Sequence, residues 1–254
     1  MAKRRRARFV ALTSLLAVHH PEVDADSAIA TGRVLVDGRA LTNPAAQVRS
    51  DAAVRVLPER RLRGEIKLAY ALRTLAVPVQ DAVALDVGAS AGGFTVALLH
   101  AGARRVYAVD AGVGALRGRL RADERVINLE GHNLGDLTVE HVPEPIRLAT
   151  MDLSYLSIAS AVPQLAPLRF TAGAHILVLV KPTFELGRAS LARRPEDVAA
   201  ALGSAAAGLA SSGWTPLATA AAPSTGRGGA VEVFLYGRRA ETSTGMTPGL
   251  RQNY

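Results

Sequence analysis

A glycine-rich turn limits the folds open to this chain more than any other feature of the sequence. It occupies residues 85–95, LDVGASAGGFT, and follows an apolar run at residues 82–85 that is typical of a buried parallel strand. Glycine tolerates positive φ angles and lets a ligand approach the backbone closely. A helix predicted from Phe94 onward would add free N–H groups and the positive end of a helix dipole. This order of strand, turn and helix predicts a nucleotide-binding corner.

The spacing of the glycines narrows the choice of nucleotide. Residues 88–93, from Gly88 to Gly93, follow a GxxxGG pattern. This pattern differs from the GxGxxG of most dinucleotide sites and favours S-adenosylmethionine over NAD. Asp110 ends the next apolar segment, 24 positions after Asp86. A carboxylate roughly 20 residues beyond a glycine-rich turn can accept hydrogen bonds from a ribose diol. The alternative is that Asp110 only caps the helix that follows.

Composition sets further limits on the class of protein. The 254 residues are 49% hydrophobic, which is enough for one large domain or for a large and a small one. The chain has no cysteine, which excludes disulfides, zinc-thiolate sites and cysteine nucleophiles, and we expect no metal site. A net charge of +8 favours a polyanionic partner. Because the chain has no apolar run of about 18 residues and no apolar segment after its basic start, we expect no membrane span, no secretory signal and a cytoplasmic location.

Residues 1–60 predict a separate small α+β module. Apolar residues at helical spacing from Phe9 to Leu16 predict its first helix. A second helix, capped by Asp24 or Asp26, is predicted to end near the next glycine.

The rest of this module predicts short strands. A β-hairpin with an Asp-Gly turn is predicted at residues 34–41, a third strand at residues 53–56, and a polar, basic linker at residues 58–63. Two helices followed by the segment GRVLVDGR resemble the ribosomal S-four-type RNA-binding domain. In that family the second helix and the hairpin present basic side chains to structured RNA. The resemblance therefore implies RNA contacts by Arg33 and Arg39.

Positive charge is concentrated near the start of the chain. Residues 1–65 hold 12 Lys and Arg against 7 Asp and Glu. The predicted second helix has three acids and no basic residue, so we expect a basic N-terminal arm to supply the missing RNA contacts. A solvated arm without a partner is the alternative. The predicted RNA-binding residues are Lys3, Arg4, Arg5, Arg6, Arg8, Arg33 and Arg39.

Predicted strands and helices alternate over residues 61–240, and a polar tail at residues 241–254 is expected to be disordered. Such alternation predicts a doubly wound, mostly parallel, seven-stranded Rossmann-like α/β sheet with helices on both faces. Ligands of such sheets bind at the carboxyl ends of the strands. The predicted strands are residues 82–87, 105–109, 125–129, 147–151, 174–180, 214–221 and 230–236, and the predicted helices are residues 64–75, 92–101, 113–121, 156–166 and 196–211.

Four charged residues stand out against this alternation. Asp152 and Lys181 each follow an apolar run, where a strand is predicted to end, and Lys67 lies near the start of the first predicted helix. Glu232 interrupts an apolar late strand. Simpler interpretations are that Lys181 marks the point where the chain reaches water and that Glu232 faces solvent on an edge strand.

Six motifs occur in order along the chain: RGEIKL, DVGASAGGFT, VYAVDAG, MDLSYLS, LVKPTFE and STGRGGAVEVF. With the N-terminal module in front, this series resembles the TlyA (hemolysin A) family of FtsJ-like ribosomal RNA 2′-O-methyltransferases. The resemblance implies S-adenosylmethionine as cofactor, ribosomal RNA or ribosomal subunits as partner, and a catalytic tetrad of Lys67, Asp152, Lys181 and Glu232. Three motifs depart from the family pattern, at residues 63–65, at Thr183 and before Glu232. Glu185 is therefore an alternative fourth member.

The chemistry of methyl transfer gives each of these groups a role. A ribose hydroxyl needs deprotonation, and a lysine, whose ordinary pKa is about 10.4, can act as base only when burial or a second cation lowers its pKa. We assign Lys181 as base, Lys67 as the cation that tunes and positions it, and the two acids as groups that orient the amines. The predicted cofactor-binding residues are Asp86, Gly88, Ala89, Ser90, Gly92, Gly93, Phe94, Asp110 and Asn133.

Other functions remain open at this stage. The same fold could methylate a small molecule, or the chain could be a non-catalytic RNA-binding or ribosome-assembly factor. A membrane-lytic activity is disfavoured because the sequence has no spanning or strongly amphipathic segment. A dehydrogenase is disfavoured by the glycine spacing.

Overall fold

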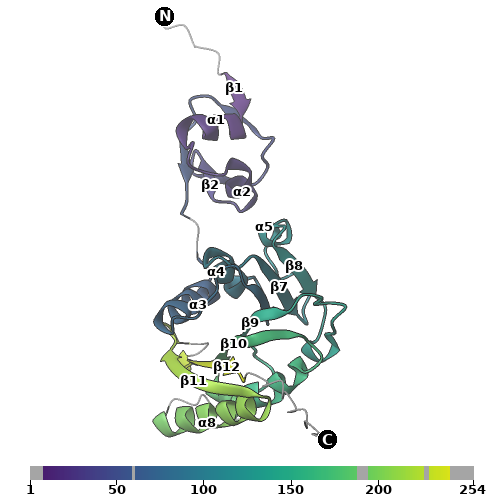
Figure 1. Ribbon diagram of the computed structural model, residues 1–254. Coiled ribbons are helices and arrows are strands. Elements are labelled where there is room, and N and C mark those ends of the chain that lie inside the picture. The colour runs from purple at the N-terminus through teal and green to yellow at the C-terminus, as the bar shows by residue number, and fades with distance from the viewer. Residues whose placement is uncertain (1–7, 59–60, 188–193, 226–228, 241–254) are drawn as a thin grey trace, which may run out of the picture. The chain divides into compact units, whose positions relative to one another are not determined.

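The computed structural model describes residues 8–58, 61–187, 194–225 and 229–240. The chain divides into two compact units, Met1–Arg60 and Arg61–Tyr254 (Figure 1). Most of the predicted basic arm, residues 3–6, and the predicted tail, residues 241–254, lie outside the described residues.

The first unit contains two short helices and two small antiparallel sheets. Its helices are α1 (Leu12–His19) and α2 (Ala25–Ala30), and its strands are β1 (Phe9–Ala11), β2 (Val34–Val36), β3 (Arg39–Leu41), β4 (Gln47–Arg49) and β5 (Val54–Val56). β1 pairs with β4, and the second sheet has the order β3-β2-β5. The prediction of helix at Phe9 was wrong, because β1 forms a ladder with a strand 38 residues away, at Gln47–Arg49. Asp24 caps α2 by accepting a hydrogen bond from Ser27 N at 3.3 Å.

The second unit contains a seven-stranded sheet with the order β11-β12-β10-β9-β6-β7-β8. The strands β10, β9, β6, β7 and β8 are parallel to one another, whereas β12 runs antiparallel to both β10 and β11. The mostly parallel α/β fold predicted from the sequence is confirmed. The strands are β6 (Val83–Val87), β7 (Arg105–Asp110), β8 (Val126–Glu130), β9 (Ile146–Met151), β10 (Phe170–Val180), β11 (Trp214–Ala221) and β12 (Val233–Arg239).

Helices cover both faces of this sheet because its buried strands are apolar on both sides. The helices are α3 (Arg63–Thr74), α4 (Gly93–His100), α5 (Gly118–Arg121), α6 (Ile158–Ala161), α7 (Pro182–Glu185) and α8 (Pro195–Ser211), with 3-10 turns η1 (Leu134–Asp136) and η2 (Val162–Leu165). Within the described part of the chain, no helix combines the length and the apolar character needed to cross a membrane.

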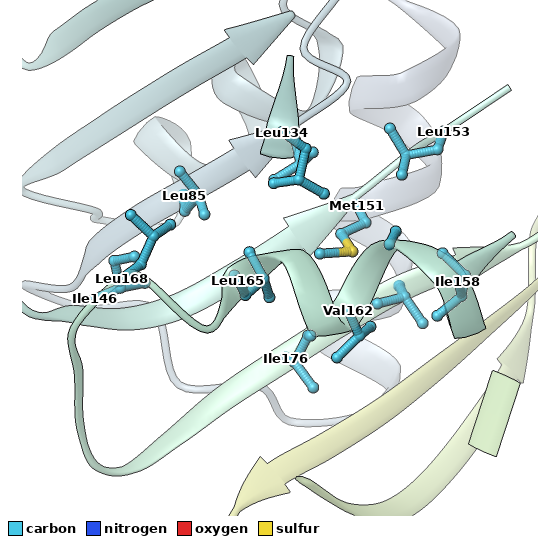
Figure 2. Packing of buried hydrophobic residues seen from close by; sticks show 14 of the residues in the cluster. Leu85, Leu134, Ile146, Met151, Leu153, Ile158, Val162, Leu165, Leu168 and Ile176 are labelled. Atoms are coloured by element: carbon cyan, nitrogen blue, oxygen red, sulfur yellow. The ribbon is translucent and has the colours of Figure 1, made fainter. Parts of the chain in front are cut away.

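Alternate residues of each strand enter two separate cores. Leu177 and Leu179 of β10 pack with Leu68 of α3 and Phe94 of α4 on one face. Ile176 of the same strand packs with α6, η2 and α8 on the other face. Figure 2 shows part of this second core, in which Ile158, Val162 and Leu165 of the helical segment lie beside Met151 and Ile176 of the sheet.

Three predicted elements differ from the structure. The helix predicted at residues 113–121 is present only as α5, and the helix predicted at residues 156–166 is divided into α6 and the 3-10 turn η2, which contains Pro163. The strand predicted at residues 230–236 begins three residues later, at Val233. Glu232 consequently lies just before β12 rather than within it.

Candidate functional site

The glycine-rich corner joins β6 to α4 through a backbone that ordinary residues rarely adopt. Gly88 has φ of +82°, Ser90 has φ of +47°, and Gly92, the N-cap of α4, has φ of +89°. A side chain at the two glycines would strain the left-handed backbone. The turn therefore depends on glycine at these positions and stores local strain at Ser90.

Close packing adds a second requirement for glycine. A Cβ atom on Gly88 would lie 2.5 Å from the carbonyl oxygen of Asp152, and one on Gly93 would lie 3.0 Å from the backbone of Gly64 and Glu65. The corner is thus in contact with the end of β9 on one side and with the start of α3 on the other.

Asp86 supports this corner from inside the sheet. Its carboxylate is fully buried and accepts hydrogen bonds from the hydroxyls of Thr95, at 2.7 Å, and Thr150, at 3.2 Å. Burial raises the pKa of Asp86 from 3.8 to about 7, although both hydroxyls oppose the rise. Asp86 therefore ties β6 to α4 and β9, and it faces away from solvent.

This raised pKa predicts a pH dependence of stability that Asp86→Asn should remove. Between about pH 4 and pH 7, Asp86 binds a proton more readily in the folded protein than in the unfolded chain. The contribution of Asp86 to the free energy of unfolding therefore falls as pH rises through this range. Urea unfolding of both proteins from pH 4 to pH 8 measures the difference. We expect the free energy of the Asn variant, relative to the parent protein, to rise with pH up to about 7 and then level off. Parallel pH curves would contradict this role of Asp86.

Asp110 lies at the carboxyl end of β7, beside the glycine-rich turn. Its two carboxylate oxygens accept hydrogen bonds from Ser90 N and Gly112 N, both at 2.8 Å. No described helix begins at Asp110, since α5 starts at Gly118, and the interpretation of Asp110 as a helix cap is therefore wrong. Each oxygen keeps a second lone pair that can accept a ligand hydroxyl.

The loop after β8 contains the predicted adenine contact. Asn133 is exposed and donates a hydrogen bond to Asp136 at 3.1 Å, and the ring of His132 packs edge-on against His141. Glu130, which sequence reasoning missed, accepts hydrogen bonds from the backbone N–H groups of residues 115 and 116 and from Arg121. Bonds to these backbone groups lower the pKa of Glu130 to about 2, so its carboxylate stays ionised and holds the loop before α5.

A cavity of about 390 Å³ opens at the corner. Four residues at the start of the second unit, Arg61 to Gly64, form part of its wall, and sequence reasoning missed them although the RGEIKL motif begins there. The lining also includes Ala91, which was not predicted, and six residues that were: Gly88, Ala89, Ser90, Gly93, Phe94 and Asp152.

The four residues of the predicted tetrad form two lysine–carboxylate pairs. Lys67, on α3, forms an ion pair with Glu232, and their side chains are only 10% and 7% exposed. Lys181 Nζ lies 2.5 Å from Asp152 Oδ1 and donates a hydrogen bond to Ser154 Oγ at 2.7 Å. Glu232 is buried beside a strand that has neighbours on both sides, so its interpretation as a solvent-facing residue of an edge strand is wrong. Lys181 is ion-paired, but its side chain remains 14% exposed.

Strand register explains why these residues meet. Val87 pairs with Met151 on β9, so Gly88 and Asp152 are the next residues on the same edge. Val180 pairs with Val233 on antiparallel β12, so the next pair would be Lys181 and Glu232. β12 is reversed, and its amino end therefore reaches the edge where the parallel strands have their carboxyl ends.

The two other acids near this edge have structural partners. Glu185, the alternative tetrad member, accepts hydrogen bonds from Ile158 N at 2.7 Å, Ala159 N at 3.3 Å and Ser204 Oγ at 3.1 Å. Glu65 accepts hydrogen bonds from Arg61 Nε and Leu62 N and so caps α3. The geometry therefore favours Glu232 over Glu185 as the partner of Lys67.

Breaking the buried pair should destabilise the fold. In Glu232→Gln, Lys67 keeps a buried charge without a counter-charge, and we expect a loss of about 3–5 kcal/mol in the free energy of unfolding. Replacing both residues, as Lys67→Met with Glu232→Leu, should cost less because no charge remains buried. Urea unfolding measures both variants, with Arg125→Gln, which breaks the partly exposed pair with Asp123, as a nearly neutral control. A single variant as stable as the control would contradict the prediction.

The predicted RNA-binding residues that are described lie in the first unit. Arg8 and Arg39 are exposed, whereas Arg33 Nε donates a hydrogen bond to Leu57 O at 2.9 Å and is partly used in holding the fold. Lys3, Arg4, Arg5 and Arg6 lie outside the described residues.

Comparison with known proteins agrees with this geometry. The FtsJ-like methyltransferase family matches residues 60–238. The chain is 35% identical over 241 residues to the 16S/23S rRNA (cytidine-2′-O)-methyltransferase TlyA of Mycobacterium tuberculosis, covering 91% of this chain and 90% of that protein. It is 32% identical over 175 residues to Hemolysin A of Brachyspira hyodysenteriae, covering 66% and 71%. A solved structure named as a hemolysin from Streptococcus thermophilus superposes with a TM-score of 0.67 at 27% identity, covering 91% and 89%. The chain therefore belongs to the FtsJ-like methyltransferase family.

Proposed function

We propose that this protein transfers a methyl group from S-adenosylmethionine to a ribose 2′-hydroxyl of ribosomal RNA. One observation carries the proposal: a glycine-lined cavity and two lysine–carboxylate pairs lie on the same edge of one sheet. The name of the Mycobacterium tuberculosis relative, an rRNA (cytidine-2′-O)-methyltransferase, supports the same acceptor.

The residues around the cavity suit S-adenosylmethionine. A volume of about 390 Å³ lies in the usual range for a small-molecule site. We assign Gly88, Ser90 and Gly93, which line the cavity, to the methionine moiety, and Asp110 to the ribose hydroxyls. Asn133 is assigned to the adenine. The cofactor supplies a methyl group activated by its sulfonium, and the protein must align the acceptor and remove one proton.

In this mechanism Lys181 receives the proton of the 2′-hydroxyl. It must first lose its own proton, and its side chain, 14% exposed, has a path to solvent. Asp152 and Ser154 hold the amine, and we assign Lys67, which is ion-paired with Glu232, to positioning at the same edge of the sheet. The 2′-oxygen could then accept the methyl group, which a bound S-adenosylmethionine would supply from its sulfonium.

The use of lysine at this site is itself informative. The chain has 27 arginines and only three lysines, and two of the three are Lys67 and Lys181. Arginine carries charge as well as lysine but cannot be deprotonated in a protein. The presence of two of the three lysines at the candidate site therefore supports a role in which an amine changes its protonation state.

The test is transfer of labelled methyl from S-adenosylmethionine to naked rRNA, to each ribosomal subunit and to whole ribosomes. Methylated riboses resist alkaline cleavage, and this resistance maps the site. We expect at least one RNA substrate to be labelled at a ribose. Cofactor binding without transfer to any RNA would contradict the proposal and favour a small-molecule acceptor or a non-catalytic role.

A further inference from the structure

A second cavity lies on the opposite edge of the sheet from the candidate active site. Its volume is about 350 Å³. It is built at the amino ends of β9 and β10 and at the carboxyl end of antiparallel β12, and roughly 17 Å of strand separates His175 from Val180 at the catalytic edge. Its lining consists of Arg147, Thr171, Ala172, Gly173, His175 and Arg238.

An irregularity in β10 creates this cavity. The register between β10 and β9 shifts between Phe170 and His175, so the intervening residues leave the regular ladder. Gly173 has φ of +64°, and a Cβ atom there would lie 2.7 Å from Arg238 Nη2. Glycine at this position lets the guanidinium of Arg238 lie directly against the backbone.

Basic side chains predominate among the charged residues that line the cavity. Two arginines and one histidine line it, and among the described residues no carboxylate does. His175 lies opposite Arg238 on β12, and its Nδ1 lies 2.7 Å from the hydroxyl of Tyr236, whose ring stacks on the imidazole. Burial, Arg238 and Arg147 lower the pKa of His175 below its ordinary value. The described groups beside His175 thus include two cations and one phenol.

We propose that this cavity binds a phosphate group. Guanidinium groups match phosphate oxygens with paired hydrogen bonds, and the hydroxyl of Thr171 offers a further donor. The phosphate could be inorganic or a phosphodiester of an RNA strand, since both present the same oxygens. This inference does not rest on methyl transfer, because it concerns the other edge of the sheet.

Titration of His175 by NMR tests the site with inorganic phosphate. A bound anion offsets the two arginine charges, so we expect the pKa of His175 to rise as phosphate is added and the change to saturate. Arg147→Gln and Arg238→Gln should each weaken the response, whereas Arg73→Gln, which removes one exposed charge elsewhere, should not. Arg147 is exposed, and its variant remains informative if Arg238→Gln does not fold. A response no larger than that to sodium chloride at equal ionic strength would overturn the proposal.

A second arm distinguishes the source of the phosphate. If RNA occupies the cavity, Arg147→Gln should weaken rRNA binding more than Arg73→Gln, reduce the salt slope of binding by about 1, and make binding insensitive to competing phosphate. If inorganic phosphate is the ligand, it should bind as above while both variants bind RNA equally. Either result supports a phosphate site.

Discussion

Replacing Lys181 with arginine is expected to abolish methyl transfer as completely as replacing it with alanine. Arginine preserves the positive charge and can still reach Asp152 and Ser154. It cannot become neutral, so it cannot accept the proton of a ribose hydroxyl. Loss of a general base lowers the rate of transfer by about 10²–10⁴-fold.

The measurement is the initial rate of labelled methyl incorporation into rRNA at saturating cofactor. Calorimetric titration with S-adenosylmethionine provides the control, because Lys181 does not line the cavity and both variants should bind the cofactor nearly normally. An arginine variant with near-normal rates would show that Lys181 supplies charge rather than a proton acceptor.

Gly88→Ala should weaken both the fold and cofactor binding. The substitution forces a side chain onto a backbone with φ of +82° and moves a Cβ atom to 2.5 Å from Asp152 O. Overpacking of this kind costs about 1–3 kcal/mol, and the left-handed backbone adds to this cost. Because Asp152 also lines the cavity, any shift of its backbone changes the cofactor site and the partner of Lys181.

Urea unfolding and cofactor titration measure these two effects. Gly203→Ala is the matched control, since Gly203 lies within α8 and a Cβ atom there meets nothing within 4 Å. The same chemical change at that position should stabilise the protein by about 0.4–1 kcal/mol. Equal behaviour of the two variants would contradict the requirement for glycine at position 88.

The fold of the second unit was predictable because its signals are local. Apolar runs, turns and helix periodicity identified all seven strands of the sheet, and the glycine spacing identified the corner. The errors in the predicted helices arise where contacts with residues far away in the sequence determine the local conformation. Phe9 and Val10 continue a helical pattern but pair with β4, and residues 115 and 116 leave a predicted helix because Glu130, at the end of β8, takes their N–H groups.

The candidate site was predictable as a set of residue types but not as a set of partners. The motifs identified both lysines and both acids, yet the pairing of Lys67 with Glu232 depends on β12 entering the sheet in reverse between β10 and β11. No local pattern encodes that insertion. Nor could sequence spacing show that Glu185, only four residues after Lys181, directs its carboxylate to α6.

Glu185 has a mechanical consequence for the site. It lies on α7, which begins directly after Lys181. Its hydrogen bonds reach Ser204 on α8 and the start of α6, which begins four residues after Ser154. These hydrogen bonds connect α7, α6 and α8. They therefore restrain motion that would separate the amine of Lys181 from Ser154. A misplacement of about 1 Å can cost about 10²-fold in rate. If Lys181 is the base that we propose, the accuracy of the reaction depends on the stiffness supplied by a carboxylate that faces a neighbouring helix.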